Sequence, residues 1–159
     1  MPFPDTYMAA CQGGRKSMST ELLFVYGTLR RSYRLDGDKP HPMHRLLAHH
    51  ARFIDDGECA GRLFNLGSYP GLVPALSPDE RVKGELYQLE QSSRLLALLD
   101  EYEDYKPGAP ALSEYLRVRM TVRGARLGLV PAWVYTYNRR PLTMERIHSG
   151  DFCQANVPG

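Results

Sequence analysis

One stretch of the sequence organises the rest of the chain: Phe24-Val25-Tyr26-Gly27-Thr28-Leu29-Arg30. The apolar residues from Leu22 to Val25 include aromatic and β-branched side chains, which predicts a buried strand. The strand stops abruptly at Gly27, and glycine allows a ligand to approach the main chain closely. Such a turn can direct successive backbone N–H groups toward an anion or an oxyanion, although an ordinary strand-to-loop turn has the same composition.

Length and charge favour one ordinary globular domain. A chain of 159 residues is long enough to bury a core without disulfides or metals. A net charge of +2 and a charged fraction of 24% give no reason to expect nucleic acid or a membrane surface as a partner. No apolar run approaches the length of a membrane span. The oligomeric state is not indicated.

The residues before the first predicted strand differ in character from the domain. Prolines and glycines between Met1 and Thr20 break any periodicity, and no apolar region suits a secretory signal. Met18 is close enough to the strand to serve as an alternative start. We therefore predict a mobile extension over residues 1–20 and a single domain over residues 21–155.

Cysteine and histidine positions do not indicate a metal site. The cysteines are odd in number and widely spaced, at positions 11, 59 and 153, which argues against a disulfide framework or a zinc cluster and fits a reducing, cytoplasmic compartment. His41 and His44 have a spacing that could suit a metal. However, Pro42 lies between them and no cysteine is near, so a loop followed by a helix start is the better prediction.

Hydrophobic periodicity predicts the remaining elements. Strands are expected at residues 51–61, 61–64, 81–89, 114–123 and 130–137, helices at 43–50 and 92–104, and a polar loop at 32–42, with residues 147–152 closing the domain. In the strand at 81–89, Glu85 is predicted to lie on the face that does not carry Val82 and Leu86. It could lie inside a barrel or at an edge. Residues 65–74 are dense in turn formers but apolar, so this loop could pack over a pocket or merely cover the surface.

The helix at 92–104 carries the most informative acid. Its apolar face is predicted to consist of Leu95, Leu98, Leu99 and Tyr102. If positions are measured as angles around the helix axis with Leu95 at zero, Glu103 lies at about 80°. It is therefore nearer this face than Asp100, Glu101 or Asp104. Partial burial and the helix C-terminus would both raise the pKa of Glu103. Such a carboxyl suits a general acid/base, but a rim carboxylate paired with Lys106 or an arginine fits the same pattern.

Several short motifs follow one another in an order that resembles the γ-glutamylcyclotransferase-like family, which includes the γ-glutamylamine cyclotransferases and the AIG2-like proteins. The resemblance extends from about Leu22 to Phe152. The motifs are Tyr26-Gly27-Thr28-Leu29-Arg30, Gly61-Arg62-Leu63-Phe64 with Tyr69-Pro70-Gly71, Gly84-Glu85-Leu86-Tyr87, Leu99-Asp100-Glu101-Tyr102-Glu103, Tyr115-Leu116-Arg117, Trp133-Val134-Tyr135 and Ser149-Gly150-Asp151-Phe152.

This resemblance implies an α+β fold, a small mixed β-barrel flanked by a few helices. It implies that the loop formed by Tyr26, Gly27, Thr28 and Leu29 lines a substrate cavity with backbone N–H groups, and that Glu103 is the acid/base. Tyr115 and Tyr135 could orient the substrate through their hydroxyls, or could simply pack the barrel. One departure is that Asp104 follows the motif glutamate, where amine-specific relatives commonly have glycine.

The reaction implied is that of an acyltransferase acting on a small γ-glutamyl compound, without a cofactor or metal. The α-amine would attack its own side-chain carbonyl, releasing 5-oxoproline and a free amine or amino acid. Two other functions are compatible with the sequence. A protein of this fold could bind a small molecule without turnover, or the chain could be an interaction module that uses the exposed loop at residues 69–74 or the N-terminal extension.

Overall fold

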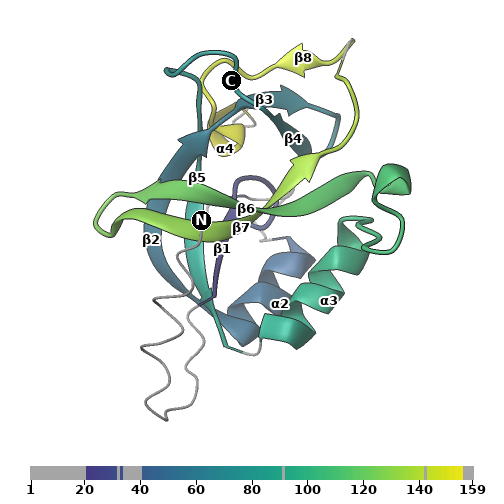
Figure 1. Cartoon of the computed structure of the whole chain (residues 1–159). Helices are drawn as coiled ribbons and strands as arrows, with labels where there is room; N and C mark the ends of the chain where they lie inside the picture. Colours follow the sequence, from purple (N-terminus) through teal and green to yellow (C-terminus); the bar gives the residue numbers. More distant parts are fainter. Residues whose placement is uncertain (1–20, 32, 34–40, 91, 142, 156–159) are drawn as a thin grey trace.

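A computed structural model describes residues 21–31, 33, 41–90, 92–141 and 143–155 (Figure 1). The predicted extension at 1–20 and most of the predicted loop at 32–42 lie outside the described residues. Within the described part of the chain, no helix is long and apolar enough to cross a membrane.

The described chain contains a closed barrel and a smaller sheet (Figure 1). The barrel has the strand order β1-β5-β2-β6-β7, and the second sheet has the order β4-β3-β8. The barrel is mixed, because β1 pairs antiparallel with β5 and parallel with β7. The barrel strands are β1 (Leu22–Val25), β2 (Ala51–Ala60), β5 (Arg81–Leu89), β6 (Tyr115–Gly124) and β7 (Gly128–Tyr137).

Helices flank the barrel, which confirms the predicted α+β class. Helices α2 and α3 lie at one end of the barrel, and the β4-β3-β8 sheet lies at the other (Figure 1). The other elements are α2 (Pro42–His50), α3 (Ser92–Tyr102), a 3₁₀ helix (Pro110–Leu112), α4 (Phe152–Ala155), β3 (Arg62–Asn65), β4 (Pro70–Val73) and β8 (Glu145–Arg146).

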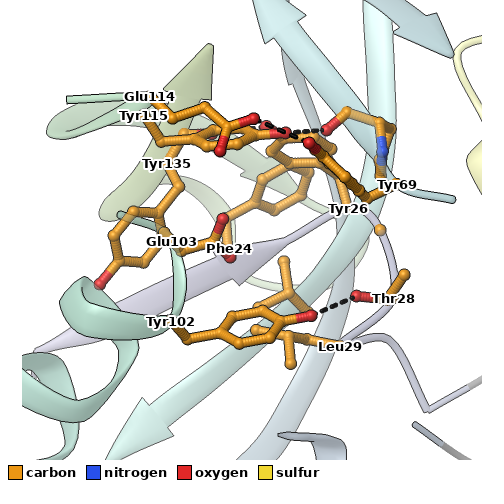
Figure 2. A pocket seen from close by; sticks show the side chains of 13 residues that line it. Phe24, Tyr26, Thr28, Leu29, Tyr69, Tyr102, Glu103, Glu114, Tyr115 and Tyr135 are labelled. Atoms are coloured by element: carbon orange, nitrogen blue, oxygen red, sulfur yellow. Dashed lines mark hydrogen bonds between the residues drawn. The ribbon is translucent and has the colours of Figure 1, made fainter. Parts of the chain in front are cut away.

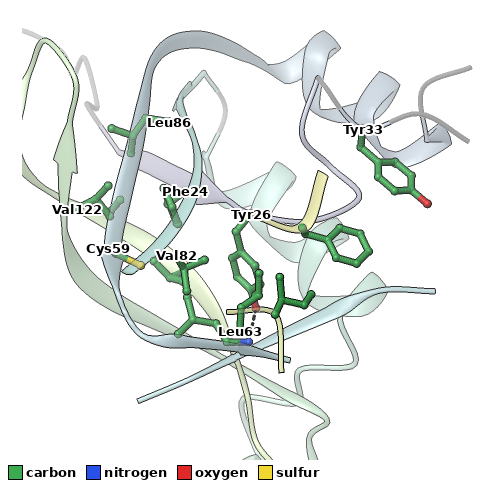
Figure 3. Close-up of a cluster of buried hydrophobic side chains, with 13 residues drawn as sticks. Phe24, Tyr26, Tyr33, Cys59, Leu63, Val82, Leu86 and Val122 are labelled. Atoms are coloured by element: carbon green, nitrogen blue, oxygen red, sulfur yellow. Dashed lines mark hydrogen bonds between the residues drawn. The ribbon is translucent and has the colours of Figure 1, made fainter. Parts of the chain in front are cut away.

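Two clusters of buried side chains form the core, one inside the barrel and one between the barrel and the helices. Strand β1 contributes to both, because successive side chains of a strand point to opposite faces. Phe24 belongs to the first cluster with Leu86 and Val122 (Figure 3). Leu23 and Val25 belong to the second, with residues of α2 and α3. The strand that leads to Gly27 is therefore fixed from both sides.

The prediction of a loop over residues 65–74 is wrong in its second half, because Pro70–Val73 forms strand β4. The turn formers complete a tight hairpin, in which the N–H of Leu66 donates to the carbonyl oxygen of Tyr69 at 2.9 Å and the Asn65 side chain accepts from Gly67 N–H at 2.9 Å. The residues after this turn are free to pair with β3.

The helix predicted at 92–104 ends at Tyr102, because the chain forms a Schellman motif. The N–H of Tyr105 donates to the carbonyl oxygen of Asp100 at 2.8 Å, and that of Asp104 donates to Glu101 at 3.2 Å. Asp104 has a φ of 58°, the left-handed conformation that this motif requires and that aspartate tolerates better than most residues. Glu103 is consequently the last residue before the reversal rather than part of the helix.

The buried face of α3 also differs from the prediction. Leu98 is 39% exposed and Tyr102 is 41% exposed, whereas Leu96 and Asp100 are buried beside Leu95 and Leu99. The face is rotated because Asp100 has partners on β6 and β7, described below, that draw this acid toward the barrel.

Candidate active site

A cavity of about 220 Å³ opens where β1 ends (Figure 2). Its walls come from β1 and the following turn, the β3–β4 hairpin, the end of α3, and strands β6 and β7. The lining residues are Phe24, Val25, Tyr26, Gly27, Thr28, Leu29, Tyr69, Pro70, Tyr102, Glu103, Glu114, Tyr115 and Tyr135. Every site residue predicted from the sequence lies on this wall, and the remaining lining residues were not predicted as site residues.

The turn after β1 presents unused backbone donors. Within the described residues, the N–H groups of Gly27, Thr28 and Leu29 donate no hydrogen bond to another protein group, whereas that of Arg30 donates to the carbonyl oxygen of Gly27 at 3.1 Å. Gly27, Thr28 and Leu29 line the cavity, whereas Arg30 does not. Adjacent free N–H groups form a site suited to an anion or a developing oxyanion.

Gly27 is required by the close approach of the β3–β4 hairpin. A Cβ atom at this position would lie 2.7 Å from Pro70 Cγ and 2.8 Å from Pro70 Cδ. We expect Gly27→Ala to lower the free energy of unfolding by about 1–3 kcal/mol, because the rigid proline ring would have to move. Chemical denaturation checks this value. Gly108→Ala is the matched control, since no described residue other than its chain neighbours has an atom within 4 Å of its Cβ position. Equal stability of the two variants would contradict the prediction.

Glu103 is the acid that faces the cavity without a partner. In Figure 2 its carboxyl projects between Tyr102 on one side and Glu114 and Tyr115 on the other. No hydrogen bond or ion pair to this carboxyl exists among the described residues, and Lys106 pairs instead with Asp104. Burial, and secondarily the charge of Glu114, raise the pKa of Glu103 to about 8. A carboxyl with this pKa can both accept and donate a proton near neutral pH.

Asp100, predicted to project away from the buried face, is instead the structural acid of this region. Arg117 binds it in a bidentate manner, with Nε donating to Oδ1 at 2.8 Å and Nη2 to Oδ2 at 3.1 Å. The hydroxyl of Tyr135 donates to the same Oδ1 at 2.6 Å. The charge of Asp100 is thus compensated, whereas the carboxyl of Glu103 has no such partner among the described residues. The proton of the Tyr135 hydroxyl is also committed to this contact.

The other tyrosines of the inner wall also use their hydroxyl protons within the protein. Tyr115 donates to the carbonyl oxygen of Pro70 at 2.6 Å. Tyr26 donates to the carbonyl oxygen of Tyr135 at 2.5 Å and accepts from Leu72 N–H at 3.2 Å. Burial raises the pKa of both phenols. Tyr115 and Tyr135 therefore present rings and oxygen lone pairs, rather than hydroxyl protons, to a ligand.

Glu85 anchors the far side of the turn. It is 2% exposed and lies on the same face of β5 as Tyr87, which packs in the helix-facing cluster, so it is neither inside the barrel nor at an edge. Its Oε1 accepts from Arg31 N–H at 2.8 Å and from the Tyr87 hydroxyl at 3.1 Å. Arg30 donates to Asp151 Oδ1 at 2.8 Å. The segment that follows the free N–H groups is thereby tied to the barrel and to the C-terminal part of the domain.

The family model of γ-glutamyl cyclotransferase, AIG2-like proteins matches residues 23–154. The chain belongs to this family. An AIG2-like protein from Mus musculus is similar in structure, with 26% identity, a TM-score of 0.60, and coverage of 82% of this chain and 88% of that one. The protein ytfP from Escherichia coli is also similar in structure, with 28% identity and a TM-score of 0.53. The match covers 86% of this chain and 99% of ytfP. No curated protein sequence matches the chain.

Two other solved structures show how far the likeness extends. YkqA from Bacillus subtilis is 25% identical with a TM-score of 0.60, and the match covers 84% of this chain but only 40% of YkqA. The chain thus spans less than half the length of that relative. A γ-glutamyl cyclotransferase structure is similar in fold, at 16% identity with a TM-score of 0.51.

The cyclotransferase-like domain has no evident place for a metal ion in its described part. Among residues 21–31, 33, 41–90, 92–141 and 143–155, no group of three or more His, Cys, Asp or Glu side chains could hold one. His41 has a structural contact, because its Nδ1 accepts from Met43 N–H at 3.0 Å at the start of α2. Pro42 occupies the first turn of that helix, as expected for a helix start.

The raised pKa of Glu103 predicts a pH-dependent stability difference. Folded Glu103 titrates at a pKa of about 8 and the unfolded chain near the ordinary 4.5, so the folded state binds more protons between these values and the wild type loses stability as pH rises. We expect Glu103→Gln to lie close to the wild type near pH 5 and to exceed it by about 3–4 kcal/mol near pH 8.5. Denaturant titrations at both pH values, with the exposed Glu101→Gln as control, test this. A difference that does not vary with pH would contradict it.

Proposed function

We propose that this protein is a γ-glutamyl cyclotransferase that converts a small γ-glutamyl compound into 5-oxoproline and a free amine or amino acid. The observation that carries the proposal is the position of Glu103. An unpaired carboxyl with a pKa of about 8 and a set of free backbone N–H groups line the same small cavity. Membership of the family supports the same reaction.

The first step of the proposed reaction is proton removal. Ionised Glu103 takes a proton from the α-ammonium group, and the neutral amine then attacks the γ-carbonyl carbon of the same molecule. A C–N bond forms, and the carbonyl oxygen becomes an oxyanion. The N–H groups of Gly27, Thr28 and Leu29 are suited to stabilise this oxyanion. Because the nucleophile and the carbonyl belong to one molecule, a cavity that holds the folded-back conformer supplies much of the rate enhancement.

The second step expels the leaving amine. The tetrahedral intermediate collapses, the original amide C–N bond breaks, and protonated Glu103 donates its proton to the leaving nitrogen. Overall, the α-nitrogen loses two protons on becoming the lactam N–H, and the leaving nitrogen gains two when it departs as an ammonium ion. One carboxyl can transfer these protons in turn if its pKa lies close to the working pH.

The proposed catalytic unit is a single domain over residues 21–155, acting in the cytoplasm. The family match to residues 23–154 supports the domain limits. The odd number and wide spacing of the cysteines, together with the buried thiol of Cys59, support a reducing compartment.

The test of the proposed function is release of 5-oxoproline from a panel of γ-glutamyl amines, γ-glutamyl amino acids and glutathione. We expect 5-oxoproline and the free amine in equal amounts from at least one class. Ligand-induced rises in melting temperature without product would indicate a binding protein of the same fold. Neither product nor a thermal shift with any compound would favour an interaction module.

A further inference from the structure

The charged side chains that line the cavity are all acidic. The described residues that line it include Glu103 and Glu114 and no lysine, arginine or histidine. A leaving group that carries its own carboxylate would therefore meet no cationic partner on this wall. A positively charged group would be attracted to whichever of the acids is ionised.

Glu114 is the acid positioned to supply this charge. Its backbone N–H donates to the carbonyl oxygen of Asp104 at 3.0 Å, and its own carbonyl oxygen accepts from Asn138 N–H at 2.9 Å. These contacts fix the main chain between the reversal after α3 and the end of β7. Oε2 of Glu114 accepts from the Tyr69 hydroxyl at 2.8 Å. Among the described residues, Oε1 has no partner and remains available to a ligand.

The location of Glu114 relative to Glu103 suggests which part of a substrate it contacts. Tyr69 is 37% exposed, so the Tyr69–Glu114 contact lies at the mouth of the cavity, while Glu103 projects into its middle (Figure 2). A cavity of about 220 Å³ is smaller than a typical ligand pocket. It has room for the glutamyl group, and the amine substituent then extends to the mouth.

We infer that Glu114 is a specificity-determining residue that favours γ-glutamyl compounds whose leaving amine carries a second, positively charged group. The inference rests on the proposed function and names its substrate class as γ-glutamyl derivatives of diamines or similar cationic amines. Glu103 transfers protons, and Glu114 binds the cationic group with Tyr69 holding its carboxylate in place. Anionic leaving amines are disfavoured by repulsion from the same carboxylate.

The test compares leaving amines of similar length and different charge. The γ-glutamyl amides of 1,4-diaminobutane, pentylamine and 4-aminobutanoate present a cationic, a neutral and an anionic group at the mouth. We expect the wild-type kcat/KM to be at least about 10-fold higher for the cationic amide than for the neutral one. Glu114→Gln should lower the cationic value by about 10–100-fold, change the neutral value by less than about 3-fold, and raise the anionic value.

Two further variants sharpen the comparison. Glu114→Lys should reverse the order of the cationic and anionic amides. Glu145→Gln removes an exposed acid of β8 outside the cavity and should leave the order unchanged. The decisive quantity is the ratio of kcat/KM between the cationic and the neutral amide. Glu114 also raises the pKa of Glu103, but this effect changes kcat/KM for all the amides alike.

The outcomes separate this inference from the proposed function. Equal loss with all the amides in Glu114→Gln, or no charge preference in the wild type, would overturn the role of Glu114 while turnover stands. If no variant releases 5-oxoproline, the function is wrong, and dissociation constants of the same amides decide the inference. A cationic preference in binding that Glu114→Gln abolishes would support it, and binding without charge preference would overturn it.

Discussion

Replacing Glu103 by glutamine should lower kcat by about 10²–10⁴-fold, the usual contribution of a general acid/base. The substitution keeps the shape of the side chain and removes its ability to transfer a proton. Among the described residues, no hydrogen bond or ion pair depends on the carboxylate, so the variant should fold normally. Substrate affinity should change little, because the cavity walls and the free N–H groups are preserved.

The comparison needs kinetics and binding on the same preparation. Steady-state 5-oxoproline release gives kcat, and isothermal calorimetry with the inactive variant gives the dissociation constant. Glu101→Gln is the matched control, because Glu101 is an exposed acid two residues earlier and should retain full activity. Normal turnover in a well-folded Glu103→Gln variant would show that another group transfers the protons.

Replacing Asp100 by alanine should produce the largest loss of stability. Asp100 is 8% exposed and accepts from both Arg117 and Tyr135. Its removal would leave a guanidinium and a phenol without their partner in a mostly buried setting. Loss of one member of a buried ion pair costs about 3–5 kcal/mol, and the partial exposure of Arg117 places the expected value near the lower end.

Thermal and denaturant unfolding of Asp100→Ala measure this loss, with Glu101→Ala as the control on the same helix. The control should remain close to the wild type, since exposed substitutions usually change stability little. Asp100→Asn should fall between the two, because the amide oxygen can still accept one hydrogen bond. If Asp100→Ala were as stable as Glu101→Ala, the network with Arg117 and Tyr135 would not support the fold.

The sequence predicted those parts of the fold that depend on local patterns. Alternation of apolar and polar residues located β5 and β6, aromatic and β-branched residues located β7, and the apolar run before Gly27 located β1. The order of the motifs indicated the family and, through it, the mixed barrel. The helical period also predicted Glu103 near the buried side of α3, but only approximately, because the helix ends at Tyr102 and its buried face is rotated.

Features that depend on distant partners could not be predicted. Asp100 is buried because Arg117, 17 positions away, and Tyr135, 35 positions away, lie beside it in the fold. The pairing of Tyr69 with Glu114 joins residues 45 positions apart. Neither pair has a local signature, so Asp100 was expected to face away and Glu114 was not recognised as a site residue. The end of α3 had a weak local signal, since aspartate is one of the few residues that tolerate the conformation of Asp104.

In the proposed mechanism the substrate's own amine attacks the γ-glutamyl carbonyl, with Glu103 as acid/base. The most direct test is the reaction in H₂¹⁸O, followed by mass spectrometry of the products. We predict 5-oxoproline without ¹⁸O from the wild type, free amine in equal amount, and almost no product from Glu103→Gln. Glutamate carrying ¹⁸O would show attack by water instead, and undiminished 5-oxoproline from Glu103→Gln would contradict the role of that residue.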